Sequence, residues 1–353
     1  MANDTEQIST VLNNYFTDDG DAFDNIYNKH AFMRYLFEKD LEGNGEFQRV
    51  NKSSGGKQIE HPLEIAEGGI TATYDGLDEI QFGTVDTMSN TQWEWKNLVS
   101  TLTLDKKKII ERKGQASILA DYVATKLKNV QKSIRSETSR LLFATTVGAK
   151  DFDSIPTIVV KDPTASATVG GINGNTAATA YWRNRTQDSG TAIGGNAVTT
   201  YEDLIKAMTS LALTQGQNAA DDMPDLALTD QIVYEYILFW FQAKGQFFFT
   251  DNQMSKAVGF EVPIVRGMNV VTDVLVPDMK DSGAATSSVF QLNTEYLRFT
   301  VEEERQFTVE GKLDLMHRGQ DAWGWPIMLR GNFTCSNRDK QGLLWGIPRT
   351  LAS

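Results

Sequence analysis

The sequence has few of the residues that build disulfide, metal and nucleophile sites. Its 353 residues include one cysteine, Cys335, and three histidines, His30, His61 and His317. A single cysteine excludes an intramolecular disulfide and is typical of a reducing compartment. The histidines are widely separated, and Cys335 has no partner at zinc-ligand spacing. We therefore expect no metal and no cofactor, and because no spacing selects a catalytic carboxylate pair, we expect no enzyme.

Long apolar runs are also missing. The longest strongly apolar run, residues 236–241, is far shorter than the ~18 residues that a membrane span needs. The first ten residues lack the basic start and apolar core of a secretory signal. We expect a protein made in a cytoplasm, with no membrane partner.

The chain lacks an excess of basic residues. Its net charge of -12 argues against a protein that coats DNA through an extended basic face. The charge is uneven, however: residues 106–140 hold ten Lys and Arg against three Asp and Glu, whereas residues 1–50 hold ten acids against four bases. Either these are solvated surfaces, or surfaces of opposite sign meet in an assembly.

The clearest periodic pattern lies in residues 115–147, which no glycine or proline interrupts. Apolar residues recur there at spacings of three and four, which predicts a helix of roughly thirty residues, ~45 Å long. A single apolar stripe of this length has to lie along a sheet or another helix. The opposite, basic face carries Lys126, Lys128, Lys132 and Arg135.

The segment before this helix reads as a projecting β-hairpin. Trp93 and Trp95 would share one face of an extended strand, and Leu102 and Leu104 would share another. Residues 68–90 contain few large apolar groups, so the tip of such a hairpin cannot bury a core alone. Residues 1–50 are polar, with one short amphipathic helix predicted over residues 31–40.

From residue 199 onward the sequence predicts a second lobe of mixed helices and strands. A helix begins at residue 200, a buried strand, turn and helix follow within residues 224–242, and short β-branched strands occupy residues 262–278. The tail predicts further strands, residues 297–301 and 307–309 among them.

The stretch "TVGGINGNTAATAYWRNR", residues 168–185, combines glycines with an aromatic and basic cluster. It matches neither G-x-G-x-x-G nor G-x-x-x-x-G-K-[ST], the two glycine patterns that bind phosphates. We therefore expect its glycines to supply turn conformations that other residues do not adopt. Aromatic residues and arginine either stack on bases or sugars or fill protein interfaces, and the interface is favoured. The candidate inter-subunit or loop anchors are Trp93, Trp95, Tyr181, Trp182, Arg183 and Arg185. Replacing Trp182 would then harm assembly more than folding.

With its elements in this order, the sequence resembles the major capsid proteins of tailed bacteriophages with the HK97-type fold. The resemblance is carried by "VGGINGNTAATAYWRN", residues 169–184, and by "NFTCSNRDKQGLLWGI", residues 332–347, and it extends from about residue 55 onward. The motif departs from its usual form in having Tyr181-Trp182 where two tryptophans are common.

The resemblance implies an α+β fold with four parts. Residues 1–56 would be an N-terminal arm, and residues 57–104 an extended hairpin loop that reaches a neighbour. Residues 105–150 and 286–340 would form a peripheral domain around the long spine helix. Residues 151–285 and 341–353 would form an axial domain.

The implied function is a shell of hexamers and pentamers around packaged double-stranded DNA, located in the virion. Its partners would be copies of itself, a portal, and DNA through weak non-specific contacts, with scaffolding and decoration proteins as further candidates. Two alternatives remain: an encapsulin-like compartment of the same fold, and a glycan-binding protein or enzyme with Trp182, Trp323 and Trp325 as a sugar platform.

Overall fold

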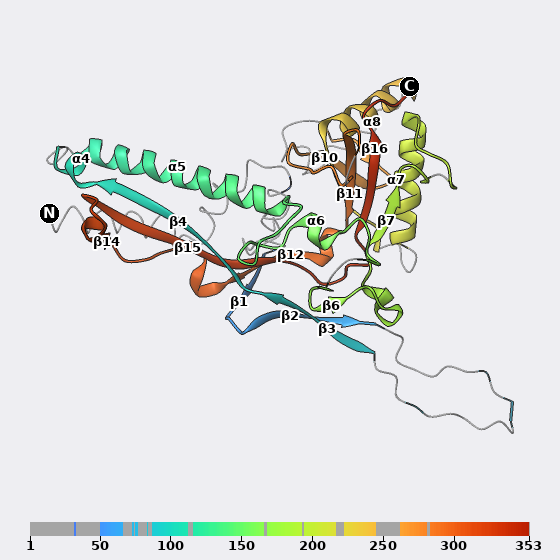
Figure 1. The fold of residues 1–353 in the computed structure, drawn as a ribbon, viewed down its shortest axis with the longest axis horizontal. Helices are drawn as coiled ribbons and strands as arrows, with labels where there is room; N and C mark the ends of the chain where they lie inside the picture. The colour runs from blue at the N-terminus through green and yellow to red at the C-terminus, as the bar shows by residue number, and fades with distance from the viewer. Residues whose placement is uncertain are drawn as a thin grey trace.

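The computed structural model describes residues 50–65, 87–111, 116–165, 168–192, 194–216, 222–244, 262–280 and 283–352, together with residues 32, 73, 75, 76 and 83. Figure 1 shows a long helix lying over a ribbon of strands, a second lobe of helices and strands beside it, and a hairpin that projects from the body. None of the helices in the described ranges is both long and apolar enough for a membrane span.

The first sheet is built on β15 (Ala322–Cys335), a strand of 14 residues. Along β15 runs β4 (Lys96–Asp105), antiparallel, in a register from Ala322↔Asp105 to Gly331↔Lys96. Alternation in β4 buries Leu102 and Leu104, as the sequence predicts. The other strands of this sheet are β1 (Val50–Ser53), β12 (Leu297–Glu302), β13 (Thr308–Val309) and β14 (Leu313–Asp314).

The predicted long helix is present as α5 (Ala116–Leu142), preceded by the short α4 (Lys106–Glu111). Its 27 residues span ~40 Å, and it packs along β4 (Figure 1). It ends five residues earlier than predicted, because residues 145–147 are all β-branched and disfavour the helix. Among its described side chains, the buried apolar ones are Val123, Leu127, Val130, Ile134, Leu141 and Leu142.

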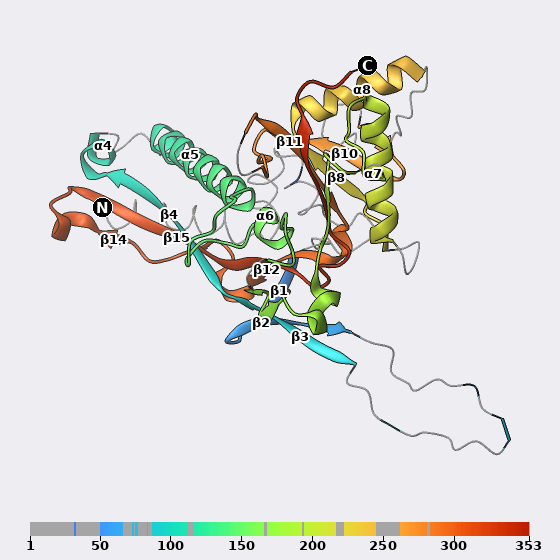
Figure 2. The same ribbon diagram turned by 45° about the vertical axis from the view of Figure 1, so that its right-hand side comes forward.

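The hairpin consists of β2 (Gln58–Glu64) and β3 (Met88–Glu94), antiparallel in a register from Gln58↔Glu94 to Glu64↔Met88. One face carries the buried Ile59, Leu63 and Trp93, and most other positions are exposed. Both views show β2 and β3 leaving the body away from α5 (Figures 1 and 2).

The second sheet has the order β7-β16-β11-β8-β10-β9. Its strands are β7 (Arg185–Asp188), β8 (Leu226–Thr229), β9 (Ile264–Val265), β10 (Met268–Thr272), β11 (Thr286–Leu292) and β16 (Gly342–Pro348). Two helices pack on it, α7 (Tyr201–Gln215) and α8 (Gln231–Lys244). The strand, turn and helix predicted within residues 224–242 are confirmed as β8 and α8.

Alternation in the second sheet separates two cores. In β8, Leu226 and Leu228 join the core that also contains α5, whereas Ala227 faces the core under α7 and α8. In β11, Phe290 and Val289 divide in the same way. One face of this sheet therefore belongs to the second lobe alone, and the other makes a continuous core with the first lobe.

Short elements connect the two sheets. They are α6 (Ile155–Ile158), β5 (Thr168–Val169), β6 (Ile172–Asn173), η1 (Ala177–Trp182) and η3 (Thr294–Tyr296). Two further short helices, η4 (Glu303–Arg305) and η5 (Leu315–Arg318), lie between strands of the first sheet.

Three expected boundaries differ from the strand pairing. β11 lies between β8 and β16 in the second sheet, although residues 286–340 were expected in the other lobe. β4 belongs to the first sheet and not to the hairpin, and β1 pairs with β12 although residues 1–56 were expected as an arm. Strand partners lie far apart in the sequence, so local patterns do not specify them. The helix expected over residues 31–40 lies outside the described residues except for Phe32, which is helical and fully buried.

Candidate assembly surfaces

The glycine-rich stretch forms a small hairpin. β5 and β6 pair through Thr168↔Asn173 and Val169↔Ile172, with Gly170 and Gly171 between them. Both glycines have a positive φ, 56° and 77°. That combination is typical of the two-residue type I′ turn, which side chains other than those of Gly, Asn and Asp rarely allow.

Two tryptophans lie next to this turn, Trp93 from the hairpin strand β3 and Trp182 from η1. A Cβ added at Gly170 would lie 2.9 Å from Cζ2 of Trp93 and 3.1 Å from Cζ2 of Trp182. The backbone N–H of Gln92 donates to the carbonyl of Gly170 at 2.8 Å, which ties the hairpin strand β3 to the turn. The rings of Trp93 and Trp182 therefore occupy the space next to Gly170, where any side chain would point.

Trp182 is fully buried within its own chain. Its indole Nε1 donates to the carbonyl of Val169 at 2.8 Å, and Arg183 donates to the carbonyls of Gly174 and Thr176 at 2.7 and 3.1 Å. Trp182 therefore holds the glycine turn to η1, and Arg183 holds the segment that leads into η1. This burial is at odds with the expectation that Trp182 serves assembly more than folding, because the fold itself depends on a side chain of this size.

The other expected anchors have separate surroundings. Trp93 is buried in the large core, whereas Trp95 is partly buried at the break between β3 and β4 and has the Arg330 guanidinium 5.2 Å from its ring centroid. Tyr181 is partly buried against the same core. Arg185 forms an ion pair of 2.8 Å with Asp339 and is half-exposed. The structure thus brings Trp93 and Trp182 together but leaves Trp95 and Arg185 elsewhere.

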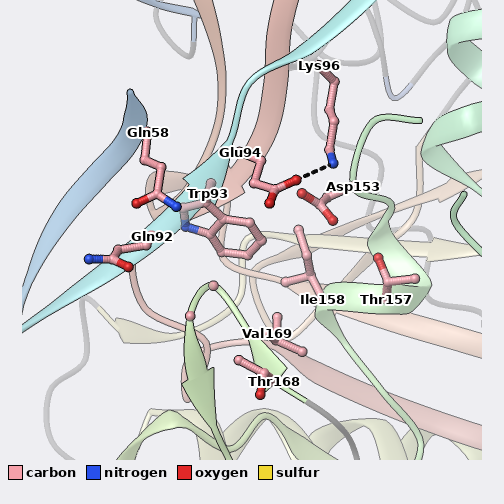
Figure 3. Close-up of a pocket in the computed structure, with 12 residues that line it drawn as sticks. Gln58, Gln92, Trp93, Glu94, Lys96, Asp153, Thr157, Ile158, Thr168 and Val169 are labelled. Carbon is pink, nitrogen blue, oxygen red and sulfur yellow. Dashed lines mark hydrogen bonds and ion pairs between the residues drawn. The ribbon is translucent and has the colours of Figure 1, made fainter. Parts of the chain in front are cut away.

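A cleft of about 330 Å³ opens between the base of the hairpin, α6 and the glycine turn. Figure 3 shows the residues that line the cleft: Trp93, Ile158 and Val169 form its apolar side, and Asp153 lies at its polar side. Nζ of Lys96 lies 2.8 Å from a carboxylate oxygen of the exposed Glu94 and donates to the carbonyl of Ala149 at 2.7 Å. The cleft is therefore mostly polar, and it lies where the hairpin leaves the body.

Asn332 joins three segments beside this cleft, a role that the sequence pattern did not indicate. Its Nδ2 donates to the carbonyl of Glu94 at 2.9 Å and to Oδ2 of Asp153 at 2.6 Å. Its Oδ1 accepts from the backbone N–H groups of Asp153 and Phe333, both at 2.9 Å. Burial raises the pKa of the Asp153 carboxyl, and the bond from Asn332 opposes that effect. An asparagine within an apolar strand was the available signal, because a buried amide needs partners for all its polar groups.

The predicted basic face of the long helix is solvent-accessible where its side chains are described. Lys128 and Lys132 are exposed, and Lys126 is half-buried with its Nζ 6.0 Å from the Tyr122 ring centroid. Arg135 lies on the same helix, but its side chain is outside the described part. Two lysines one turn apart thus present positive charge on one stretch of α5.

The alternative of a sugar platform is contradicted by burial. Trp182 and Trp325 are 0% and 1% exposed, and Trp323 is partly buried with the Nζ of Lys312 4.0 Å from its ring centroid. Two of the three rings are closed to a ligand. Across the described segments, no group of three His, Cys, Asp or Glu side chains could hold a metal ion.

Neither a protein-family model nor a curated protein sequence matches this chain. Solved structures do. A structure of the cyanophage A-1(L) capsid asymmetric unit matches with a TM-score of 0.59 and 14% identity, over 90% of this chain and 93% of that chain. The capsid of a native GTA particle matches with a TM-score of 0.51 and 12% identity, over 85% of this chain and 88% of that chain. The α+β, HK97-like capsid fold that the sequence resemblance implied is therefore the fold of this chain.

Proposed function

We propose that this chain is the major capsid protein of a tailed phage. Copies of it would form hexamers and pentamers, and these would close into an icosahedral shell around packaged double-stranded DNA. The observation that carries the proposal is the match to the cyanophage capsid subunit, which covers nine-tenths of both chains. Function depends on local sites as well as on the fold, and two local features of this chain suit assembly.

The hairpin is such a feature. β2 and β3 form a separate two-stranded sheet, which no third strand joins among the described residues. Isolated two-stranded hairpins are marginal in water, and one that extends from the body gains most from a surface supplied by another subunit. The polar cleft at its base and the exposed Met88 in β3 are surfaces that a neighbouring copy could cover.

Within this proposal the parts are assigned from the strand pairing. The hairpin, residues 57–95, would be the loop that reaches a neighbour, and residues 1–49 the arm. The first sheet with α5 would form the peripheral domain, and the second sheet with α7 and α8 would form the axial domain. β11 then belongs to the axial domain.

The charge distribution suits a DNA container. A net charge of -12 disfavours tight coating of the genome, and Lys128 and Lys132 could meet an acidic segment of a neighbour or a few phosphates. A portal is a further proposed partner, and scaffolding and decoration proteins are possible additional ones. The proposed location is the virion.

A compartment that stores protein cargo, of the encapsulin type, is the second candidate because it would use the same fold. The first test is negative-stain electron microscopy of the full chain, expressed alone and purified by size exclusion. Shells, tubes, sheets or capsomer rings would support a shell protein. A chain that stays monomeric, even with co-expressed neighbouring phage genes, would contradict it. Nuclease-protected DNA in particles from infected cells separates the phage shell from the compartment.

A further inference from the structure

Within the described residues, three segments cross between the two lobes. Residues 143–184 lead from α5 to β7, residues 293–296 lead from β11 to β12, and residues 336–341 lead from β15 to β16. The third segment, "SNRDKQ", contains five polar or charged residues after its serine, a composition typical of a solvated loop. In the structure, however, its Arg338 and Gln341 are 0% exposed.

Arg338 connects the third crossing to the first. Its Nε donates to the carbonyl of Ile158, and its Nη2 donates to Oδ1 of Asn184 at 2.9 Å. Asn184 in turn donates to the carbonyl of Val160 at 2.8 Å and accepts from the Val160 N–H at 3.2 Å. Burial lowers the pKa of Arg338 to about 10, so the guanidinium is charged at neutral pH. Its described partners are an amide and a carbonyl, not a carboxylate.

Gln341 connects the third crossing to the second. Its Nε2 donates to the carbonyl of Asn293 at 3.0 Å, and its Oε1 accepts from the Asn293 N–H at 3.1 Å. The side chain of Asn293 donates to the carbonyl of Met223 at 3.2 Å, just before β8 of the second lobe. The side-chain amide of Gln341 thus makes the same pair of hydrogen bonds with the Asn293 backbone that a residue of a neighbouring antiparallel strand would make.

Two ion pairs flank this region. Lys340 lies 2.7 Å from Asp222, and Asp222 also accepts from the Tyr296 hydroxyl at 2.9 Å. Arg185, the first residue of β7, lies 2.8 Å from Asp339. The first and second of the described crossings are therefore both bonded to residues 338–341, which belong to the third. We call Asn184, Asn293, Arg338 and Gln341 the crossover joint.

We propose that the crossover joint holds the two lobes at one fixed angle, and that Arg338 is its principal positioning residue. A buried guanidinium that loses its acceptors has no water to replace them, so rotation of one lobe against the other carries a large penalty. A second consequence rests on the proposed shell function. A fixed angle between the lobes of each subunit would set the curvature of the shell and therefore the size of the particle.

The angle can be measured without any assembly. Exposed Ser136 on α5 and exposed Ser210 on α7 can be replaced by cysteine and spin-labelled. Cys335 stays unlabelled, because it is buried and its thiol pKa is raised to about 12. Pulsed electron spin resonance then gives the distance distribution between the lobes. We expect one narrow distance in the parent chain.

The decisive variant is Arg338→Lys, because an ammonium keeps the charge but cannot present the planar fork that reaches both acceptors. We expect it to broaden the distribution and shift its mean. Arg330→Lys is the matched control: Arg330 pairs with Glu302 at 3.0 Å within the first sheet and should leave the distribution unchanged. Gln341→Met, of similar volume, tests the second connection if Arg338→Lys does not fold.

The proposal would be overturned if Arg338→Lys, or Gln341→Met in its place, gave a spin-label distance distribution with the same width and the same mean as that of the parent. A broadening equal to that of Arg330→Lys would overturn it too. Particle diameter tests the extension to curvature: we expect Arg338→Lys to give mixed diameters where Arg330→Lys gives one. A further outcome is that the parent and all variants fail to assemble while Arg338→Lys still broadens the spin-label distance distribution and Arg330→Lys does not. That result would contradict the shell function and support the role of the crossover joint.

Discussion

Trp93 of the hairpin strand and Trp182 of the glycine-rich motif meet across a single glycine. Their Cζ2 atoms lie 2.9 and 3.1 Å from where a Cβ of Gly170 would be. The two tryptophans are 89 positions apart in the sequence. The glycine turn thus fixes the base of the hairpin to the body, which gives the motif a structural role within one subunit.

Gly170→Ala should destabilise the protein through two effects. An alanine at φ +56° is strained, and its methyl group would overlap both tryptophan rings. Overpacking of this kind costs typically about 1–3 kcal/mol in addition to the strain. Gly194→Ala is the matched control, because Gly194 has φ +57° with no atom within 4 Å of the added Cβ. Urea unfolding of both variants isolates the packing cost; equal losses would contradict the contact between the rings and the turn.

Trp182→Ala should remove about 3–5 kcal/mol of stability, as large-to-small changes of buried aromatics do. Trp182→Phe keeps most of the volume but loses the bond to the Val169 carbonyl, so it should cost less. Trp323→Ala, at a partly buried position, is the comparison. Unfolding is followed by circular dichroism on unassembled protein. A Trp182→Ala chain that unfolds like the parent but no longer assembles would restore the interface interpretation.

Local chemistry accounts for what the sequence predicted well. Thr200 caps α7: its hydroxyl accepts from the Asp203 N–H at 3.2 Å, and the Asp203 carboxylate accepts from the Thr200 N–H at 3.2 Å. Such a capping box is encoded within four residues. The long helix and the β8–α8 unit are likewise specified by contiguous patterns of apolar residues, so their positions could be predicted.

Long-range pairing and buried polar groups could not be predicted. β11 is buried at all seven positions because it lies inside the second sheet, yet its partners are in β8 and β16, more than fifty positions away. Arg338 and Gln341 occur in a polar stretch that predicts a solvated loop, and only the fold shows them enclosed by three chain crossings. The need for glycine at position 342 could not be predicted either, because it depends on a contact with α7: an added Cβ would lie 1.7 Å from Nε2 of Gln215.

Reversing charge on the spine helix tests the basic face. The double substitution Lys128→Glu and Lys132→Glu should leave the fold intact, because both side chains are exposed. It should reduce the yield of closed shells, or of particles that retain DNA, since it replaces two positive charges by two negative ones. Lys280→Glu, at an exposed lysine of the second lobe, is the control for a charge change alone. Unchanged yields of DNA-filled particles would assign the basic face to solvated surface.

The attachment of the hairpin should weaken in acid through His61. Nε2 of His61 lies 3.0 Å from the Thr334 hydroxyl of β15, and the hydroxyl is also 3.2 Å from the Arg298 carbonyl. Burial, and then the positive charge of Arg298, lower the pKa of His61. Because the unfolded chain then binds the proton more tightly, the stability that His61 contributes is complete above about pH 7.5, about one unit above the ordinary histidine pKa, and declines as the pH falls.

His61→Gln removes this titration but keeps an amide that can bond the hydroxyl of Thr334. We therefore expect the parent to lose stability between about pH 7.5 and about pH 5.5 relative to His61→Gln, since only the parent gains a charge at this position over that range. His317→Gln, at the exposed histidine of η5, should follow the parent and shows whether histidine charge in general is responsible. Hydrogen exchange of the amides in β2 and β3 localises the effect: opening in acid that is as great in His61→Gln as in the parent would rule out His61 as its cause.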